Sequence, residues 1–231
     1  MQKKIVITQS NYIPWKGFFD SIALADEFIL YDDMQYTRRD WRNRNKIKTP
    51  AGLEWLTIPV EVKGKYLQKI SETKVSDRGW NASHWRTIVH NYSKAQGFAE
   101  ARDFLGELYA TATMENLSEI NLHFLTGICA YLSIPHHIRF SSEFSLAEGK
   151  TERLVDLCRQ LGATDYYTGP SAKNYMDESL FDSSQIKVHY FDYSGYKEYN
   201  QLYPPFEHGV SIIDLLCNQG NKAAAFLKYP G

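Results

Sequence analysis

The feature that most constrains the fold is the hydrophobic pattern of residues 4–33. Residues 4–8 (KIVIT) are a short apolar run typical of a buried strand, and residues 17–26 (GFFDSIALAD) carry apolar side chains at helical spacing. Residues 28–33 (FILYDD) then predict a second strand. A strand, a helix and a strand joined by short loops normally pack with the two strands parallel and adjacent. The pattern therefore predicts the start of an open parallel sheet.

The remaining segments extend this pattern. Residues 55–62 (WLTIPVEV) predict a further strand, which Pro59 weakens or places at an edge. Three helical patterns follow one another in residues 80–133, so we expect a helical insertion or cap over the sheet. Strand-like runs and two helices follow at residues 136–140, 152–163, 165–169, 186–193 and 211–220. We predict an α/β fold with a mostly parallel, open, Rossmann-like sheet and a helical insertion, in a single domain of residues 1–231.

Composition narrows the class of protein. Hydrophobic residues make up 43% of the chain and charged residues 23%, as in ordinary globular proteins, and the formal net charge of −1 gives no reason to expect a nucleic-acid partner. No apolar stretch is long enough for membrane insertion and the start MQKKIVITQS lacks a signal-peptide pattern, so we expect a cytoplasmic protein. Three cysteines in apolar helical contexts are expected to be reduced core thiols: Cys129, Cys158 and Cys217.

The loop after the first strand, residues 9–19 (QSNYIPWKGFF), is the first candidate binding site. Ligands of open α/β sheets bind outside the carboxyl ends of the strands, and a following helix offers free N–H groups to an anion. Gly17 would let a phosphate approach the backbone, and the amides of Gln9 and Asn11 would contact it, with Tyr12 and Trp15 beside them. Alternatively, Gly17 only shapes a turn and Trp15 belongs to the core.

A second group of polar residues follows the second strand. Asp32, Asp33 and Gln35 are placed to accept a ribose hydroxyl or to hold a divalent ion such as Mg²⁺ near a phosphate, although a solvated loop would have the same composition. The G-x-G-x-x-G fingerprint is missing between Thr8 and Phe18, so we do not expect NAD.

The strongest signal is the run RRDWRNRNKIK at residues 38–48, which has six cations and one acid. In an extended chain Arg42, Arg44, Lys46 and Lys48 lie on one face and repel one another unless an anion offsets them. A phosphate or pyrophosphate would do so. We assign binding roles to Arg38, Trp41, Arg42, Asn43, Arg44 and Lys46. The alternatives are a solvated surface strand and a nucleic-acid patch in which Trp41 stacks on a base; the stripe is short, so the latter would bind weakly.

Two further regions complete the predicted site. The loop of residues 168–171 follows another strand and is expected to face the same crevice, with Gly169 and Tyr175 lining it. His84 lies in the helical region beside Trp80 and Trp85 and is a candidate general base. The spacings of the histidines give no zinc site.

Two apparent motifs are better explained as helix starts. Residues 148–151 (EGKT) end like a phosphate-binding loop, but Phe144 stands where that loop needs a glycine, so we expect Thr151 to cap a helix. Ser211 and Asp214 have the spacing of a capping box.

Four segments together resemble the WbqC-like family, proteins associated with bacterial surface polysaccharide (O-antigen) biosynthesis. They are residues 9–52, WLTIPV, YYTGPSAKNYMD and SIIDLLCNQG, and the most specific part is the W-x-N-R-N-x-I-K run of residues 41–48. The sequence departs from the family's usual Gln-Pro opening by having Ser10 after Gln9. The resemblance implies transfer of a glycyl or other acyl group to an amino sugar, and it carries over no catalytic residue. The block after the first strand also looks like that of nucleotidyl-transferring enzymes with an HxGH motif, but Trp15 and Phe18 stand where these enzymes have histidines.

These observations lead to three functional hypotheses. The first is a transferase that attaches a small acyl or aminoacyl group, such as glycyl, to a nucleotide-linked amino sugar. His84 would be its base, Asp33 would hold a ribose or metal, and the reaction would use ATP or an acyl or aminoacyl donor. The alternatives are a Mg²⁺-dependent nucleotidyltransferase and a non-catalytic nucleotide-sugar-binding protein. All three predict a phosphorylated small-molecule partner, and a homodimer stays open.

Overall fold

The computed structural model describes residues 2–229 and contains a five-stranded parallel sheet. The strand order is β5-β2-β1-β6-β7, and every neighbouring pair is parallel. The strands are β1 (Lys4–Thr8), β2 (Glu27–Leu30), β5 (Ile138–Phe140), β6 (Asp165–Thr168) and β7 (Lys187–Tyr190). The prediction of an α/β fold with a mostly parallel sheet is confirmed, and the order is that of a doubly wound, Rossmann-like arrangement.

Side chains of the central strand alternate between two hydrophobic clusters. Ile5 and Ile7 of β1 pack into one cluster, and Val6 packs into the other. Because neighbouring side chains of a strand point to opposite faces, a strand that is apolar at every position is stable only with both faces covered. This explains why the KIVIT run contains no polar alternation.

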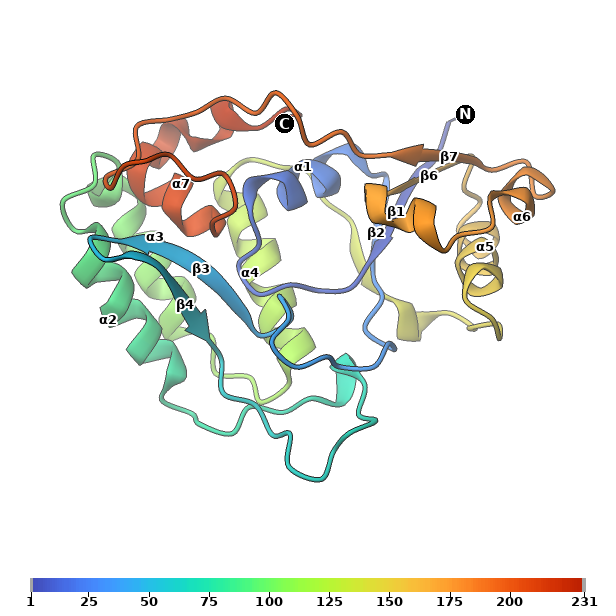
Figure 1. The fold of residues 1–231 in the computed structure, drawn as a ribbon, viewed down its shortest axis with the longest axis horizontal. Helices are drawn as coiled ribbons and strands as arrows, with labels where there is room; N and C mark the ends of the chain where they lie inside the picture. The colour runs from blue at the N-terminus through green and yellow to red at the C-terminus, as the bar shows by residue number, and fades with distance from the viewer. Residues whose placement is uncertain (1, 230–231) are drawn as a thin grey trace.

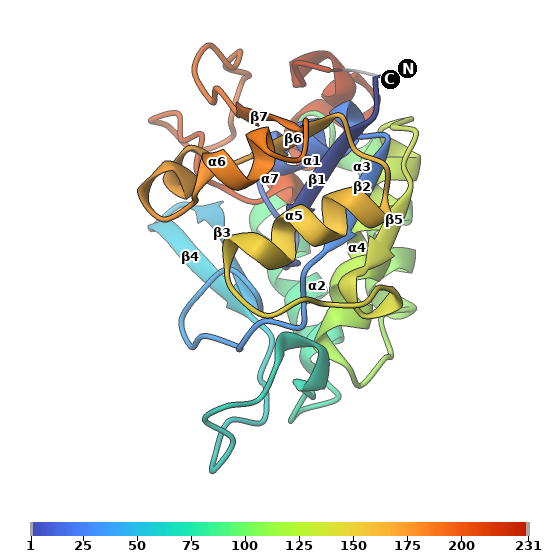
Figure 2. The same ribbon diagram turned by 90° about the vertical axis from the view of Figure 1, so that its right-hand side faces the viewer.

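Helices cover both faces of the sheet (Figure 1). Residues of α1 (Lys16–Leu24) share a cluster with Val6 and Phe28, whereas residues of α5 (Thr151–Gln160) and α6 (Glu178–Asp182) share the other cluster with Ile5 and Ile7. Figure 2 shows α5 lying across its face of the sheet. The apolar stripe of each helix thus closes one side of the strands.

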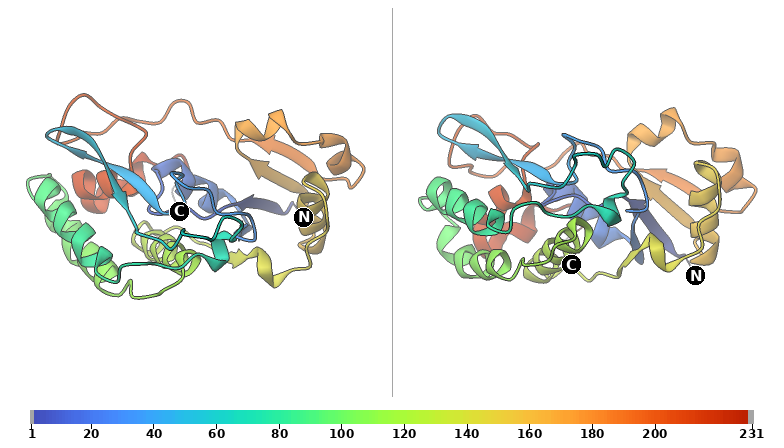
Figure 3. Two further views of the ribbon diagram at one scale, coloured as in Figure 1. Left: turned by 60° about the horizontal axis from the view of Figure 1, so that its bottom comes forward. Right: turned by 90° about the horizontal axis from the view of Figure 1, so that it is seen from below.

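Three consecutive helices occupy the region expected to be helical. They are α2 (Trp80–Tyr92), α3 (Phe98–Ala110) and α4 (Leu117–Tyr131). The C-terminal α7 (Ile212–Gln219) and the 3₁₀ helix η4 (Gly220–Phe226) join them in the same cluster as α1. Figure 3 shows α2, α3 and α7 at the end of the molecule opposite α5 and α6, with α4 between the two ends. Shorter 3₁₀ helices are η1 (Ile70–Glu72), η2 (Ser141–Glu143) and η3 (Pro170–Asn174).

The cationic run enters an antiparallel hairpin that is separate from the main sheet. β3 (Arg44–Thr49) pairs with β4 (Gly52–Thr57), and Lys46 lies opposite Trp55. The strand expected over residues 55–62 forms only over residues 55–57, because β4 begins earlier, at Gly52, and ends before Pro59. Asn45 connects the hairpin to the first loop by donating Nδ2 to the carbonyl oxygens of Tyr12 and Ile13, at 3.1 and 3.0 Å.

Two predicted caps differ in detail. Thr151 is the first residue of α5, and its hydroxyl accepts from the backbone N–H of Asp177 at 3.2 Å, so the prediction that it caps α5 is wrong. Ser211 does cap α7, but the Asp214 carboxylate accepts from Tyr92 and Tyr199 and does not form a capping box. Burial raises the pKa of Asp214, and these hydroxyl donors oppose that effect.

The three cysteines are free and buried, as predicted. In residues 2–229 no helix is long and apolar enough to cross a membrane.

Candidate functional site

A cavity of about 770 Å³ opens at the carboxyl ends of β1 and β6. These strands are neighbours, yet the chain leaves them in opposite directions, from β1 towards β2 and from β6 towards β7. Ligands of open α/β sheets bind at such a switch point. The volume falls in the range of small-molecule sites.

Aromatic side chains form much of the cavity wall. Trp15 precedes α1, and its ring packs edge-on against Tyr193 with centroids 5.2 Å apart. Tyr31 follows β2, and Tyr175 follows η3. The floor and walls are completed by Val6, Ile7, Thr8, Gln9, Phe18, Ser21, Met34, Arg42, Gly149, Lys150, Arg153, Leu154, Tyr166, Thr168, Gly169, Ser171 and Phe191. Five predicted site residues therefore line the cavity: Gln9, Trp15, Arg42, Gly169 and Tyr175.

The charged residues of this lining are all cations. Arg42 comes from the loop before β3, whereas Lys150 and Arg153 come from the start of α5. The lining residues include no aspartate, glutamate or histidine. A cavity with three cations and no carboxylate favours an anionic ligand. The cations attract an anion, and no acidic side chain of the lining repels it or neutralises them.

The start of α5 adds backbone donors to these charges. No side chain caps the helix, so its first N–H groups keep their hydrogen-bonding capacity and the positive end of the helix dipole. Gly149 has a φ of 93°, a left-handed conformation that glycine adopts without strain, and it places Lys150 at the cavity. Arg153 donates Nε to the carbonyl oxygen of Ala147 at 2.8 Å, which fixes its guanidinium.

Arg42 also holds the first loop in place. Its Nη1 donates to the carbonyl oxygens of Gln9 and Ser10 at 3.2 and 3.1 Å and to Oδ1 of Asn11 at 2.6 Å. The Nη2 atom of Arg42 lies 3.7 Å from the Asp40 carboxylate. The Arg42 side chain is 13% exposed. Asn11 is not among the residues that line the cavity, and it contacts the site only through Arg42.

Gly17 does not line the cavity, and its lack of a side chain has a structural role. A Cβ atom at Gly17 would lie 2.3 Å from the Trp15 ring, so only glycine lets the indole fold over the first turn of α1. Because Trp15 lines the cavity, Gly17 shapes the site through its neighbour.

The acidic residues after β2 contact other parts of the protein and do not line the cavity. Asp32 is buried and accepts from the Ser10 backbone N–H at 2.8 Å. Asp33 pairs with Lys69 at 3.2 Å and accepts from the Ser141 hydroxyl at 2.7 Å. Neither lines the cavity, and across residues 2–229 no group of three or more histidine, cysteine or acidic side chains is suited to hold a metal ion.

Most of the predicted cationic stripe also lies outside the cavity. The Arg44 guanidinium lies 3.9 Å from the Trp55 ring centroid, and Lys46 Nζ lies 5.8 Å from that of Trp41 and 5.1 Å from that of Trp55. The two rings pack together and are about 40% exposed. We call this outward surface of β3 and β4 the hairpin face.

Three more predicted residues hold backbone segments in place. Asn43 donates to the Ile58 carbonyl oxygen at 2.8 Å. Gln35 donates to the Tyr66 carbonyl oxygen at 2.7 Å, and Arg38 donates to the Val62 carbonyl oxygen at 2.8 Å.

His84 lies in the interior, away from the cavity. Its Nε2 is 3.2 Å from the Thr57 carbonyl oxygen, which can only accept, so Nδ1 accepts from the Tyr12 hydroxyl at 2.9 Å. Tyr12 is also hydrogen-bonded to Tyr109. Burial lowers the pKa of His84 to about 4, so the ring is neutral near pH 7. We do not retain it as a base acting on a ligand in the cavity.

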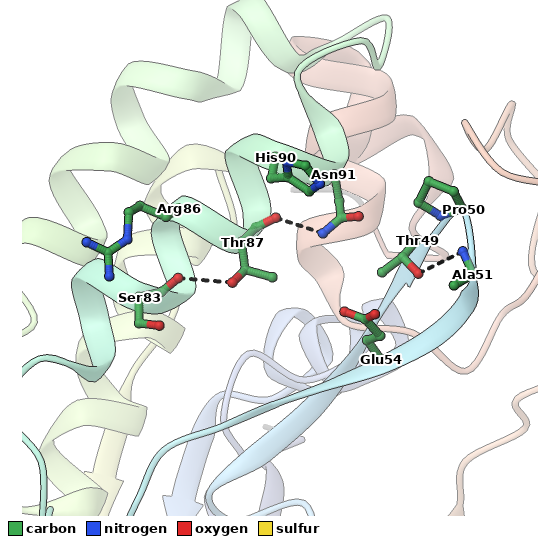
Figure 4. Close-up of a pocket in the computed structure, with 9 residues that line it drawn as sticks. All are labelled: Thr49, Pro50, Ala51, Glu54, Ser83, Arg86, Thr87, His90 and Asn91. Atoms are coloured by element: carbon green, nitrogen blue, oxygen red, sulfur yellow. Dashed lines mark hydrogen bonds between the residues drawn. The ribbon is translucent and has the colours of Figure 1, made fainter.

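A second cavity of about 480 Å³ lies between the tip of the β3–β4 hairpin and α2 (Figure 4). It contains no predicted site residue, and its lining mixes Glu54 with Arg86 and His90. Several of its polar groups already bond to one another, as Asn91 does to the Thr87 carbonyl oxygen at 2.9 Å. This mixture does not select for an anion.

Sequence reasoning missed Lys150 and Arg153 because it treated residues 148–151 only as a failed phosphate-loop motif. A topological signal was available. The helix that connects two parallel strands begins at the carboxyl edge of the sheet, and α5 connects β5 to β6. Its first turn therefore had to lie near the loop after β1.

Comparison with known proteins identifies the family. The profile of the WbqC-like protein family matches residues 9–226. A Mycobacterium tuberculosis protein, "Uncharacterized protein Rv1507c", is similar to this chain, with 53% identity over 227 residues that cover 98% of each protein. No solved structure matches the chain. On the strength of the match across nearly its whole length, the chain belongs to the WbqC-like family.

Proposed function

We propose that the cavity binds a nucleotide-linked amino sugar and that the protein attaches a small acyl or aminoacyl group, such as glycyl, to the sugar amine in surface polysaccharide biosynthesis. One observation carries the binding part of this proposal: the cavity at the switch point has three cations and no carboxylate. The resemblance of the chain to proteins associated with O-antigen biosynthesis supports the choice of sugar and reaction.

Each part of such a ligand has a matching group in the cavity. The diphosphate would lie against Lys150, Arg153 and the uncapped start of α5, because charge-assisted hydrogen bonds are the strongest available there. The aromatic wall around Trp15 and Tyr193 would take the base or the sugar ring. The polar side chains of Gln9, Thr168 and Ser171 would donate to or accept from sugar hydroxyls.

The transfer step would depend on positioning more than on an acid or base of the protein. The amine nitrogen attacks the acyl carbonyl carbon, the new C–N bond forms, and the leaving group departs with its bonding electrons while the amine loses a proton. No carboxylate or imidazole lines the cavity, so the proton would pass to the leaving group or to solvent. An activated acyl donor is therefore required, and the cavity would contribute by holding the amine in place.

The same observation favours a second candidate, a nucleotide-sugar-binding protein without catalysis. A binding protein needs the cations and the aromatic wall but no acid or base. Nucleotidyl transfer with Mg²⁺ receives less support, because the carboxylates of Asp32 and Asp33 contact different partners and do not line the cavity.

These possibilities separate in two incubations. The protein is mixed with UDP- and dTDP-linked amino sugars and an activated glycyl donor such as a glycyl thioester. A second reaction contains an amino sugar 1-phosphate, a nucleoside triphosphate and Mg²⁺, and the products of both are followed by mass spectrometry. A glycyl adduct supports transfer, released pyrophosphate with a new nucleotide-linked product supports nucleotidyl transfer, and unmodified but bound sugar supports the binding protein. If no nucleotide sugar binds at all, measured by a shift in melting temperature, the proposal is wrong.

A further inference from the structure

The loop of residues 61–69 carries the two most exposed large hydrophobic side chains of the described chain. Tyr66 is 74% exposed and Leu67 is 84% exposed. They are adjacent in a loop that projects from the molecule between β4 and η1, seen in teal at the bottom of Figure 1. Single exposed apolar residues are ordinary, whereas these two are neighbours at a projecting tip and together form a small apolar surface.

Hydrogen bonds hold this loop in shape without using the two apolar side chains. The backbone N–H of Tyr36 donates to the Gln68 carbonyl oxygen at 2.9 Å, and the Gln68 side chain donates to the Glu61 carbonyl oxygen at 2.8 Å. Gln35 donates to the Tyr66 carbonyl oxygen at 2.7 Å. Because folding of the loop does not depend on burying Tyr66 and Leu67, the exposed side chains have no evident structural role.

Positive charges surround the tip. Lys63, Lys65 and Lys69 belong to the loop, and the Arg38 guanidinium lies 5.8 Å from the centroid of the Tyr66 ring. Glu61 pairs with Lys65 and Asp33 pairs with Lys69. Within residues 2–229, neither Arg38 nor Lys63 has a carboxylate within ion-pair distance, so two of the four cations are not balanced and the tip has a net positive charge.

We propose that this loop, which we call the tip loop, adsorbs to the surface of an anionic lipid bilayer. Leu67 and Tyr66 would enter the interface between headgroups and acyl chains, where the tyrosine hydroxyl stays hydrated, while the cations remain among the anionic headgroups. Attachment of this kind is shallow and reversible and involves no spanning segment.

The size and charge of the tip favour a lipid surface over a protein partner. A stable protein interface needs roughly 800 Å² from each partner. Two side chains on a narrow loop provide far less, and the hydrogen-bonded loop offers no groove beside them. A bilayer surface needs only a few inserted apolar groups together with several cations, each of which contributes about 1 kcal/mol near anionic lipid.

The test is co-sedimentation of the full chain with lipid vesicles. One set contains phosphatidylcholine alone, and the other contains phosphatidylcholine mixed with phosphatidylglycerol. The protein is expected to bind the anionic vesicles and to be released by high salt, because screening weakens the interaction of the cations with the headgroups. Equal binding to both sets, or to neither, would overturn the proposal.

Variants of the tip loop locate the binding surface. Replacing both Tyr66→Ser and Leu67→Ser is expected to weaken vesicle binding at least about tenfold, and Lys63→Ala about fivefold. Matched controls are Leu53→Ser and Lys94→Ala, which remove an exposed apolar side chain and an exposed lysine elsewhere and should bind like the parent. Melting curves check that each variant folds.

Other outcomes contradict the proposal directly. If the double variant binds vesicles like the parent, the tip loop is not the attachment point. If it instead changes the sedimentation velocity of a self-associating chain, the loop contacts a second copy and the lipid assignment is wrong. None of the tip-loop residues lines the cavity, so either result leaves the nucleotide-sugar proposal intact.

Discussion

Two groups of cations within residues 38–48 have different surroundings. One lies at the cavity wall and the other on the hairpin face. Arg42 turns towards the first loop and lines the cavity, with its Nη1 bonded to three oxygen atoms. Arg44 and Lys46, two and four residues later, lie over exposed tryptophan rings. The same charge density is thus balanced in two ways, by hydrogen-bond acceptors and the Asp40 carboxylate at one place and by aromatic faces at the other.

Repulsion between cations on a strand therefore does not by itself require a phosphorylated ligand. At the hairpin face, Trp41 and Trp55 supply ring faces that attract cations, and solvent screens the remaining charge. At the cavity wall, the charges come from segments far apart in the sequence, namely Arg42 and the start of α5. The proposed anion site therefore rests on this convergence of cations from separate segments, and not on the charge of one strand.

The largest expected effect is at Arg42. Arg42→Ala removes both a cavity charge and the donor that holds three oxygens of the first loop, so binding of a dTDP-linked amino sugar should weaken at least about a hundredfold, and stability should fall by about 3 kcal/mol. Titration calorimetry and urea unfolding measure the two effects. Arg42→Lys keeps the charge without the fork and should recover part of the affinity. Unchanged binding by the alanine variant would break the assignment of Arg42 to the cavity wall.

His84 is a predicted site residue that lies in the interior, away from both the cavity wall and the hairpin face. Its pKa is about 4 in the fold and near 6.5 in an unfolded chain, so as the pH falls below 6.5 the unfolded state binds the proton first. Stability is therefore lost between pH 6.5 and pH 4, by about 3 kcal/mol in total.

Urea unfolding of the parent and of His84→Phe at pH 7 and pH 5 checks this expectation. Relative to the variant, the free energy of unfolding of the parent should be about 2 kcal/mol lower at pH 5 than at pH 7, because only the parent has an imidazole at position 84. A difference that is the same at both pH values would mean that the imidazole is open to solvent.

Arg153 is the next test of the cavity wall. Arg153→Ala should weaken nucleotide-sugar binding roughly tenfold to a hundredfold, because a hydrogen bond to a charged group contributes about 1.5 to 3 kcal/mol. Arg159→Ala is the matched control, since Arg159 belongs to the same helix, is exposed and does not line the cavity. Equal affinities of the two variants would argue against an anion at the start of α5.

The smallest effect is expected at the hairpin face. Arg44→Ala and Lys46→Ala should change nucleotide-sugar affinity less than about twofold and stability by less than about 1 kcal/mol, because partly exposed cations over aromatic rings contribute little. Calorimetry under the conditions used for Arg42→Ala provides the comparison. A loss as large as that of Arg42→Ala would show that the whole stripe serves one site.

Much of the fold followed from local patterns, and the site followed only in part. The parallel strands and the three consecutive helices were readable because apolar runs and helical periods are local properties. Gln9, Trp15 and Gly169 were placed by the rule that loops after parallel strands share one edge. The outward turn of Arg44 depended on a pairing partner, since Trp55 supplies the ring only once β3 and β4 form a hairpin. The burial of His84 likewise depends on Tyr12 and Thr57, which are distant in sequence.

The most direct test of the cavity is a crystal structure of the protein soaked with a dTDP-linked amino sugar. The expected result is diphosphate density in the cavity between the carboxyl ends of β1 and β6, within hydrogen-bond distance of Lys150 or Arg153 and of the first N–H groups of α5. Diphosphate density over Trp41 and Trp55, with the cavity empty, would contradict the account.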